Sequence, residues 1–84
     1  MVKPLKFTRH AMTSVAQREI ALAWIEKTVF YPDWVVPDVD DPTLERRFAV
    51  ISGFGGRTLR VVCFENNEEV RIITVFFDRK ARRP

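Results

Sequence analysis

The sequence predicts an α+β domain in which two helices pack on one face of an antiparallel sheet, in the order β-α-α-β-β-β. Apolar residues recur at helical spacing within residues 9–30, and strand-like runs fill residues 45–77. The chain has 84 residues, of which 46% are hydrophobic, so it can bury one core but not two. We therefore expect a single domain over residues 1–78, followed by a basic tail at residues 79–84.

The first third of the chain predicts a short strand and two helices. Residues 5–8 are typical of a strand, and Thr8 can act as the N-cap of a helix over residues 9–18. A second helix is expected over residues 21–30, because Pro32 follows it and cannot continue helical hydrogen bonding. The apolar side chains of these two helices are Ala11, Met12, Val15, Ala16, Leu22, Ile25 and Val29.

The remainder of the chain predicts strands. Residues 33–41 carry Pro37 among valines and aspartates, which leaves an edge strand and a loop as alternatives. Asn66 and Asn67 suit a two-residue hairpin turn, because Asn tolerates the positive φ that such a turn requires. Three strands are thus expected over residues 45–52, 58–65 and 68–77, with turns at residues 53–56 and 66–67.

The two-residue turn also predicts a register for the last hairpin. On the side that should face the helices it pairs Cys63 with Val70, Val61 with Ile72 and Leu59 with Thr74. On the opposite side it pairs Phe64 with Glu69, Val62 with Arg71 and Arg60 with Ile73. Arg60 and Arg71 would then be diagonal neighbours, within roughly 8 Å of each other.

Positive charge is concentrated at the end of the chain. The net charge is +3, and residues 1–77 contain ten basic and ten acidic side chains. The excess therefore lies after the last strand, in Arg79, Lys80, Arg82 and Arg83. Such a cluster favours a polyanion or an acidic protein as partner over a diffuse effect on solubility, and a frayed, solvated terminus is the alternative.

Several classes of protein are disfavoured by the same sequence. No apolar run approaches the roughly 18 residues that span a bilayer, and the first residues lack the apolar core of a signal peptide. A single cysteine, Cys63, excludes an internal disulfide and is expected to be an inert core residue, so we expect a soluble, cytoplasmic protein. We expect no cofactor and no metal, since residues 53–56 lack the context of a phosphate loop and the aspartates at residues 38–41 lack EF-hand spacing.

Four short stretches carry a resemblance to a known family. They are Thr8-Arg9-His10-Ala11, Arg18 with Ile20, Arg60-Val61-Val62, and Arg71-Ile72-Ile73-Thr74-Val75. In this order they resemble a bacterial family of domains of unknown function that is grouped with the RelE/ParE-like toxins and is closest to the BrnT-type toxins. The resemblance implies a RelE-like fold and a toxin of a type II toxin–antitoxin system. Such a protein cleaves RNA, on or off the ribosome, without a metal, and a small antitoxin neutralises it.

Candidate site residues follow from the chemistry of metal-free RNA cleavage, which needs a base, an acid and cations beside the phosphate. His10 is the candidate acid or base, and a structural residue at the helix start is the alternative. Arg60 and Arg71 are candidates to clamp phosphate, although they could instead pair with neighbouring glutamates. The candidate contacts to the RNA backbone are Arg47, Arg79, Lys80, Arg82 and Arg83.

Two other functions stay open. The end of the last strand, Val75-Phe76-Phe77, is apolar, and no convincing acid–base pair is evident, which favours a catalytically silent RelE-like module that binds nucleic acid or protein. Alternatively, the chain is an interaction protein, as a homodimer or bound to an antitoxin, with an edge strand at residues 33–39 available for pairing.

Overall fold

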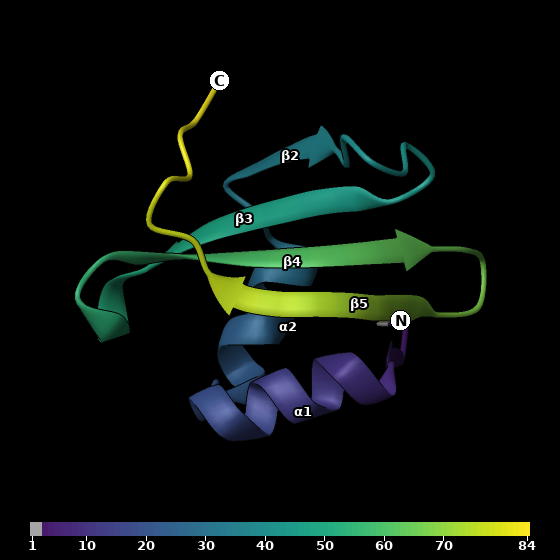
Figure 1. Cartoon of the computed structure of the whole chain (residues 1–84), viewed down its shortest axis with the longest axis horizontal. Helices are drawn as coiled ribbons and strands as arrows, with labels where there is room; N and C mark the ends of the chain where they lie inside the picture. The colour runs from purple at the N-terminus through teal and green to yellow at the C-terminus, as the bar shows by residue number, and fades with distance from the viewer. Residues whose placement is uncertain (1–2) are drawn as a thin grey trace.

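The computed structural model, which describes residues 3–84, has the predicted α+β layout (Figure 1). The predicted domain begins at residues 1–2, which lie outside the described part. No helix within residues 3–84 has the length and apolar character needed to cross a membrane. The elements are β1 (Leu5–Phe7), α1 (Arg9–Arg18), α2 (Leu22–Phe30), β2 (Trp34–Pro37), β3 (Glu45–Ile51), a 3₁₀ turn (Ser52–Phe54), β4 (Arg57–Glu65) and β5 (Val70–Phe77).

The five strands form one sheet in the order β1-β5-β4-β3-β2. Strand β1 runs parallel to β5, whereas the other neighbours are antiparallel, so the sheet is mixed. The segment that the sequence left as edge strand or loop is the edge strand β2, which pairs with β3. Pro37 is compatible with this edge position. Proline has no backbone N–H, and on an edge strand that N–H is not needed for a hydrogen bond to a further strand.

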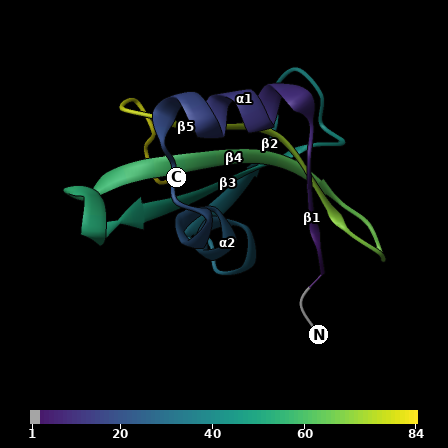
Figure 2. The same ribbon diagram turned by 90° about the horizontal axis from the view of Figure 1, so that it is seen from below.

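Both helices contribute to one core with the same side of the sheet. Helix α1 packs mainly on β5, and α2 packs on β3 and β4, as the view in Figure 2 shows. Ala11 of α1 and Ile25 and Val29 of α2 are buried against the inward residues of the strands. Leu59, Val61 and Cys63 have no exposed surface, which confirms the predicted inner side of β4. The other side of the sheet is called the open face below.

The predicted register of the last hairpin is wrong. Cys63 pairs with Ile72 instead of Val70, because the turn spans four residues and not two. The Asn66 side-chain oxygen accepts hydrogen bonds from the backbone N–H groups of Glu68 (2.8 Å) and Glu69 (2.9 Å). These side-chain bonds stabilise the longer loop. The backbone N–H of Asn66 also donates to the Glu69 carbonyl oxygen at 3.1 Å and closes the loop.

A bulge in β5 changes the register a second time. Thr74 pairs with Val62 and Ile72 pairs with Cys63, so Ile73 is an extra residue without a partner on β4. Beyond the bulge, the residues of β5 that were predicted to face the helices lie on the open face, and their neighbours face the helices instead. Val75 is therefore buried against the helices, and Thr74, which was predicted to face inward, lies on the open face.

The new register separates Arg60 from Arg71. Arg60 pairs with Phe76, whereas Arg71 pairs with Phe64, which is four residues further along β4. A strand rises about 3.3 Å per residue, so the two arginines are about 13 Å apart along the sheet. The expectation that they are diagonal neighbours is wrong, and each pairs with a different carboxylate, Arg60 with Asp78 and Arg71 with Glu69.

Candidate functional site

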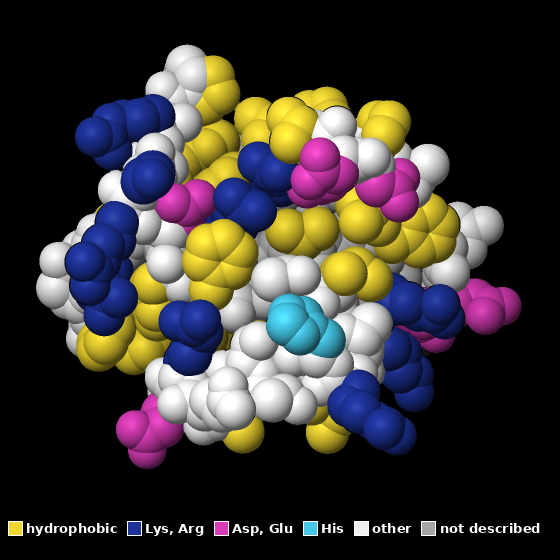
Figure 3. Space-filling model, viewed as in Figure 1, with side chains coloured by type: hydrophobic (Ala, Val, Ile, Leu, Met, Phe, Trp, Pro, Cys, Tyr) yellow, Lys and Arg dark blue, Asp and Glu magenta, His cyan; other side chains and the backbone are white. Residues whose placement is uncertain are grey.

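A pocket of about 290 Å³ lies at the end of the sheet where β4 begins and β5 ends. In Figure 3 many of the Lys and Arg side chains gather along the side of the molecule that carries the C-terminal tail. We call this cavity the basic pocket. Its lining residues are Gly56, Arg57, Thr58, Phe77, Asp78, Arg79, Ala81 and Arg82.

Asp78 holds the start of the tail in place. Its backbone N–H donates to the Thr58 carbonyl oxygen at 2.9 Å, which extends the pairing of β5 with β4 by one residue. One carboxylate oxygen accepts from the Lys80 backbone N–H at 2.9 Å, and the other accepts from Arg60 Nη1 at 3.2 Å. Further along, Arg83 Nη2 donates to the Asp33 carbonyl oxygen at 2.6 Å. The tail is thus bonded to the domain at both ends instead of being frayed.

Arg57 is supported by an aromatic platform. Its guanidinium carbon lies 4.9 Å from the ring centre of Phe54 and 4.8 Å from that of Phe77. Phe54 in turn packs on Trp24 of α2, with ring centres 5.1 Å apart. Cation–π contacts of this kind orient the planar guanidinium and leave its outer side exposed.

Two glycines place the start of β4 under this platform. Gly55 and Gly56 have φ values of +64° and +71°, in the left-handed region where a side chain would be strained. They turn the chain from the 3₁₀ turn directly into Arg57. The turn into β4, which forms one wall of the pocket, therefore requires glycine at both positions.

The arginines of the basic pocket are not neutralised by carboxylates. Within residues 3–84, ion pairs are formed by Lys3, Lys27, Arg46, Arg47, Arg60 and Arg71. Arg57, Arg79 and Arg82 form none in this part of the chain, and the single acid in the pocket, Asp78, is bonded to Arg60. The pocket thus presents three guanidinium groups that can donate forked hydrogen bonds to an anion.

Arg60, a predicted phosphate clamp, lies beside the pocket instead of inside it. Its side chain is 20% exposed, pairs with Asp78 and packs over the Phe76 ring at 4.6 Å. Its Nε atom is buried and has no hydrogen-bond partner among the described residues. These contacts make Arg60 a residue that positions Asp78 and, through it, the tail.

Arg71 and His10 lie away from the basic pocket. Arg71 is 59% exposed, pairs with Glu69 at 3.2 Å and lies opposite Lys6 of β1, at the other end of β5. His10 is exposed in the first turn of α1, and its side chain forms no hydrogen bond to another of residues 3–84. The structure therefore does not bring His10, Arg60 and Arg71 together.

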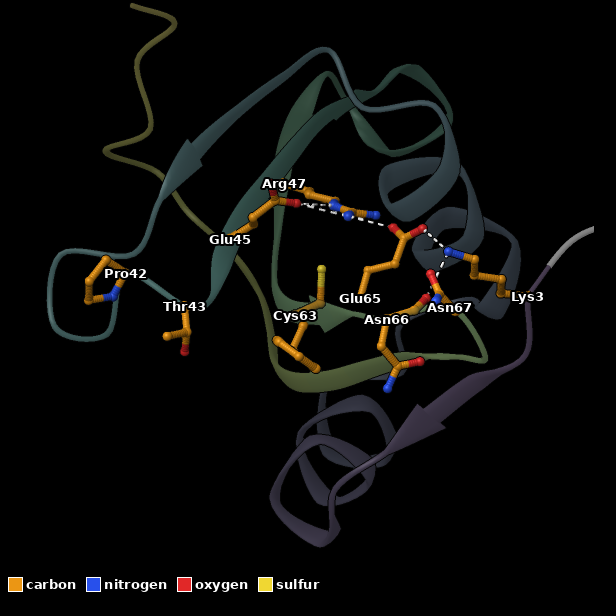
Figure 4. A pocket seen from close by; sticks show the side chains of 10 residues that line it. Lys3, Pro42, Thr43, Glu45, Arg47, Cys63, Glu65, Asn66 and Asn67 are labelled. Atoms are coloured by element: carbon orange, nitrogen blue, oxygen red, sulfur yellow. Dashed lines mark hydrogen bonds and ion pairs between the residues drawn. The ribbon is translucent and has the colours of Figure 1, made fainter.

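Arg47 is buried on the helix-facing side of the sheet, in the cluster of Figure 4. Its Nη1 donates to the Val29 carbonyl oxygen at 2.9 Å, which attaches the end of α2 to β3. Its Nη2 pairs with Glu45 at 2.8 Å and with Glu65 at 2.7 Å. The predicted contact of Arg47 with RNA is therefore unsupported, because its guanidinium is enclosed and already bonded.

Cys63 lies beside this cluster. Arg47, Glu45 and Glu65 line a pocket of about 450 Å³ together with Cys63 and Lys3 (Figure 4). Lys3 and Arg47 donate hydrogen bonds that lower the pKa of Glu65, and burial raises the pKa of the Cys63 thiol to about 11. The opposite charges in this pocket are matched, which distinguishes it from the basic pocket.

Arg57 is the pocket residue that sequence reasoning missed. Its place after Gly55-Gly56 marks a strand start, but its contact with two aromatic rings depends on the pairing of β4 with β5. Arg79 and Arg82, in contrast, were expected from the charge of the tail. Chemically, the lining residues can bind and orient an anion, and they include no His, Tyr or Cys that could transfer a proton.

Comparison with known proteins identifies a family but no function. The model of a family described as a domain of unknown function (DUF4258) matches residues 7–77, from the last residue of β1 to the last residue of β5. No curated protein and no solved structure gives a significant match. Since the matched segment covers most of the chain and all but the first part of the sheet, the chain belongs to the DUF4258 family.

Proposed function

We propose that this chain is a RelE-like module that binds RNA through its basic pocket and tail. The observation that supports the proposal most directly is the set of three arginines around one pocket, Arg57, Arg79 and Arg82, which have no carboxylate partner within the described residues 3–84. Guanidinium groups match the geometry of phosphate oxygens. When they neutralise phosphates, counterions bound to the nucleic acid are released, and this release favours binding. The resemblance to BrnT-type toxins favours RNA among the possible polyanions.

The test is a binding measurement over a range of salt concentrations. Full-length protein is titrated into a fluorescently labelled RNA, and anisotropy gives Kd at each salt concentration. In the double variant Arg79→Ala/Arg82→Ala we expect Kd to rise about tenfold or more at low salt. The slope of log Kd against log salt should fall by about 1.4, since each lost contact to a single strand accounts for about 0.7.

A matched control separates the pocket from general charge. Arg9→Ala/Arg18→Ala removes the same charge from exposed positions at the two ends of α1. This variant should keep most of the affinity. Equal losses in the two double variants, or no salt-dependent binding by the natural chain, would contradict the proposal.

Metal-independent RNA cleavage by a type II toxin is the second candidate function. The observation in its favour is the exposure of His10 in the first turn of α1 (the cyan side chain in Figure 3), where its imidazole is open to a ligand. In this reaction a base removes the proton of the 2′-hydroxyl, and the 2′-oxygen attacks the adjacent phosphorus. The P–O5′ bond breaks, and the leaving 5′-oxygen takes a proton from an acid.

Cleavage is tested with purified protein and RNA in EDTA, with and without ribosomes. Fragments that disappear in His10→Ala would support an active nuclease. Intact RNA under both conditions, together with normal growth of cells that express the chain, would exclude it and leave the binding function.

A protein partner belongs to the same proposal. An acidic antitoxin segment could cover the basic tail, and a second copy of the chain could pair with the edge strand β2, where Val35 is exposed. Light scattering of the purified chain distinguishes monomer from dimer. Co-purification with the product of the adjacent reading frame tests for an antitoxin.

A further inference from the structure

We infer that the basic pocket is a nucleotide subsite in which an unpaired base stacks on Arg57 while the adjoining phosphate binds Arg79 and Arg82. The inference rests on the proposed RNA binding and adds a specificity that phosphate contacts alone cannot supply. It assigns to Arg57 a role that its charge does not explain.

The orientation of Arg57 is the first argument. Two rings, those of Phe54 and Phe77, lie on its inner side at 4.9 and 4.8 Å, and its outer side is exposed. Proteins that bind single-stranded RNA stack bases on aromatic rings and on guanidinium planes. A guanidinium that is already in contact with two rings loses less conformational freedom when a base stacks on it.

The support beneath Arg57 is the second argument. Phe54 is 39% exposed although it is a large apolar side chain, and it continues a cluster with Trp24 and Phe77. Trp24 of α2 and Phe77 of β5 pack on the core, so they hold Phe54 of the 3₁₀ turn in place beneath Arg57. An exposed aromatic edge next to an unpaired arginine is typical of a surface that receives a base.

The size and lining of the pocket are the third argument. At about 290 Å³ the cavity is at the lower limit of small-ligand sites, which suits one nucleotide better than the side of a helix. Arg79 and Arg82 follow Asp78, whose bonds to Thr58 and Arg60 fix where the tail leaves the sheet. Base platform and phosphate ligands thus line the same cavity.

The experiment compares one RNA sequence in single-stranded and duplex form. In a duplex the base faces are stacked on each other and cannot reach Arg57, whereas the phosphates remain accessible. We expect the natural chain to bind the single strand about tenfold more tightly than the duplex at equal salt. Arg57→Lys, which keeps the charge but not the plane, should lose this preference and bind the duplex as before.

Two further variants keep the result interpretable. Phe54→Leu removes a supporting ring at a partly exposed position and should also reduce the preference for the single strand. Arg18→Lys, at the exposed end of α1, should leave it unchanged. Thermal unfolding verifies that each variant is folded before its affinity is compared.

The possible failures are distinguishable. Equal, salt-dependent binding of single strand and duplex by the natural chain would overturn the stacking subsite and leave the proposed RNA binding intact. A preference that survives in Arg57→Lys would overturn the role of Arg57. Absence of binding to both RNA forms would overturn the proposed function together with the subsite.

Discussion

Cys63 shows how burial decides the chemistry of a single residue. It has no exposed surface and lies on the helix-facing side of β4, beside the ion pairs of Arg47 with Glu45 and Glu65. Burial raises the pKa of its thiol to about 11, and the nearby Arg47 charge opposes this only in part. The thiol therefore stays protonated at neutral pH, which makes it a core residue and not a nucleophile.

This raised pKa predicts a loss of stability at alkaline pH. Above about pH 9.0 the unfolded chain loses the thiol proton, whereas the folded chain keeps it until about pH 11. The unfolded form then binds fewer protons, so the free energy of unfolding should fall between these pH values, by at most about 1.4 kcal/mol per pH unit from this group. Urea unfolding at a series of pH values measures the slope.

Cys63→Ala is the control for this prediction. The variant starts from a lower stability because a buried sulfur is lost, but its slope between pH 9 and 11 should be shallower than that of the natural chain. Contributions that do not involve the thiol are common to both proteins and cancel in the difference. Identical slopes would show that the thiol does not titrate differently in the two states.

Among the elements, the start of α1 is hydrogen-bonded to the sheet through one residue, Thr8. The Thr8 side-chain oxygen accepts a hydrogen bond from the Ala11 N–H at 3.1 Å, which caps the helix. Its hydroxyl donates to the carbonyl oxygen of Ile73 at 3.2 Å, and its backbone N–H donates to that of Ile72 at 3.0 Å. Thr8 thus joins the start of α1 to the bulge in β5.

Thr8→Ala should therefore destabilise the fold by about 1–2 kcal/mol. The cap accounts for about 1 kcal/mol, and the unpaired carbonyl of Ile73 adds to it. Thr8→Ser keeps the hydroxyl and should recover most of the loss. Chemical denaturation measures both variants, and a Thr8→Ser variant as unstable as Thr8→Ala would show that the methyl group matters more than the hydrogen bonds.

Element boundaries could be predicted from the sequence, whereas the pairing of the last hairpin could not. Thr8 and Pro32 marked the helices because capping and helix termination are local. The loop after β4 depended on whether the Asn66 side chain bonds to the backbone, which favoured four residues over two. The bulge at Ile73 coincides with the hydroxyl of Thr8, a contact between residues 65 positions apart that no local pattern reveals.

At the scale of the whole molecule, charge is divided between two ends of the sheet. One end holds the matched cluster of Arg47 with two glutamates, and the other holds the unmatched arginines of the basic pocket. The sequence predicted the excess charge of the tail, because that depends on composition alone. It could not predict the pocket, because Arg57 joins Arg79 only through the pairing of β4 with β5 and the bonds of Asp78.

The tail should contribute to binding much more than to folding. A variant that ends at Asp78 loses the hydrogen bond from Arg83 to Asp33 and the contact of Arg83 with the Trp34 ring, while the buried core remains complete. These contacts are exposed, so the free energy of unfolding should fall by less than about 1 kcal/mol. Urea unfolding measures this change.

The same truncation removes four positive charges and changes the net charge from +3 to −1. RNA affinity and its salt dependence should therefore fall steeply although the fold persists. A full-length variant with Gln in place of Arg79, Lys80, Arg82 and Arg83 should lose as much affinity as the truncation, since charge and not chain length is what both remove. If the Gln variant bound RNA as well as the natural chain, the tail would act through its backbone. If the truncated chain failed to unfold cooperatively, the tail would be part of the folding unit.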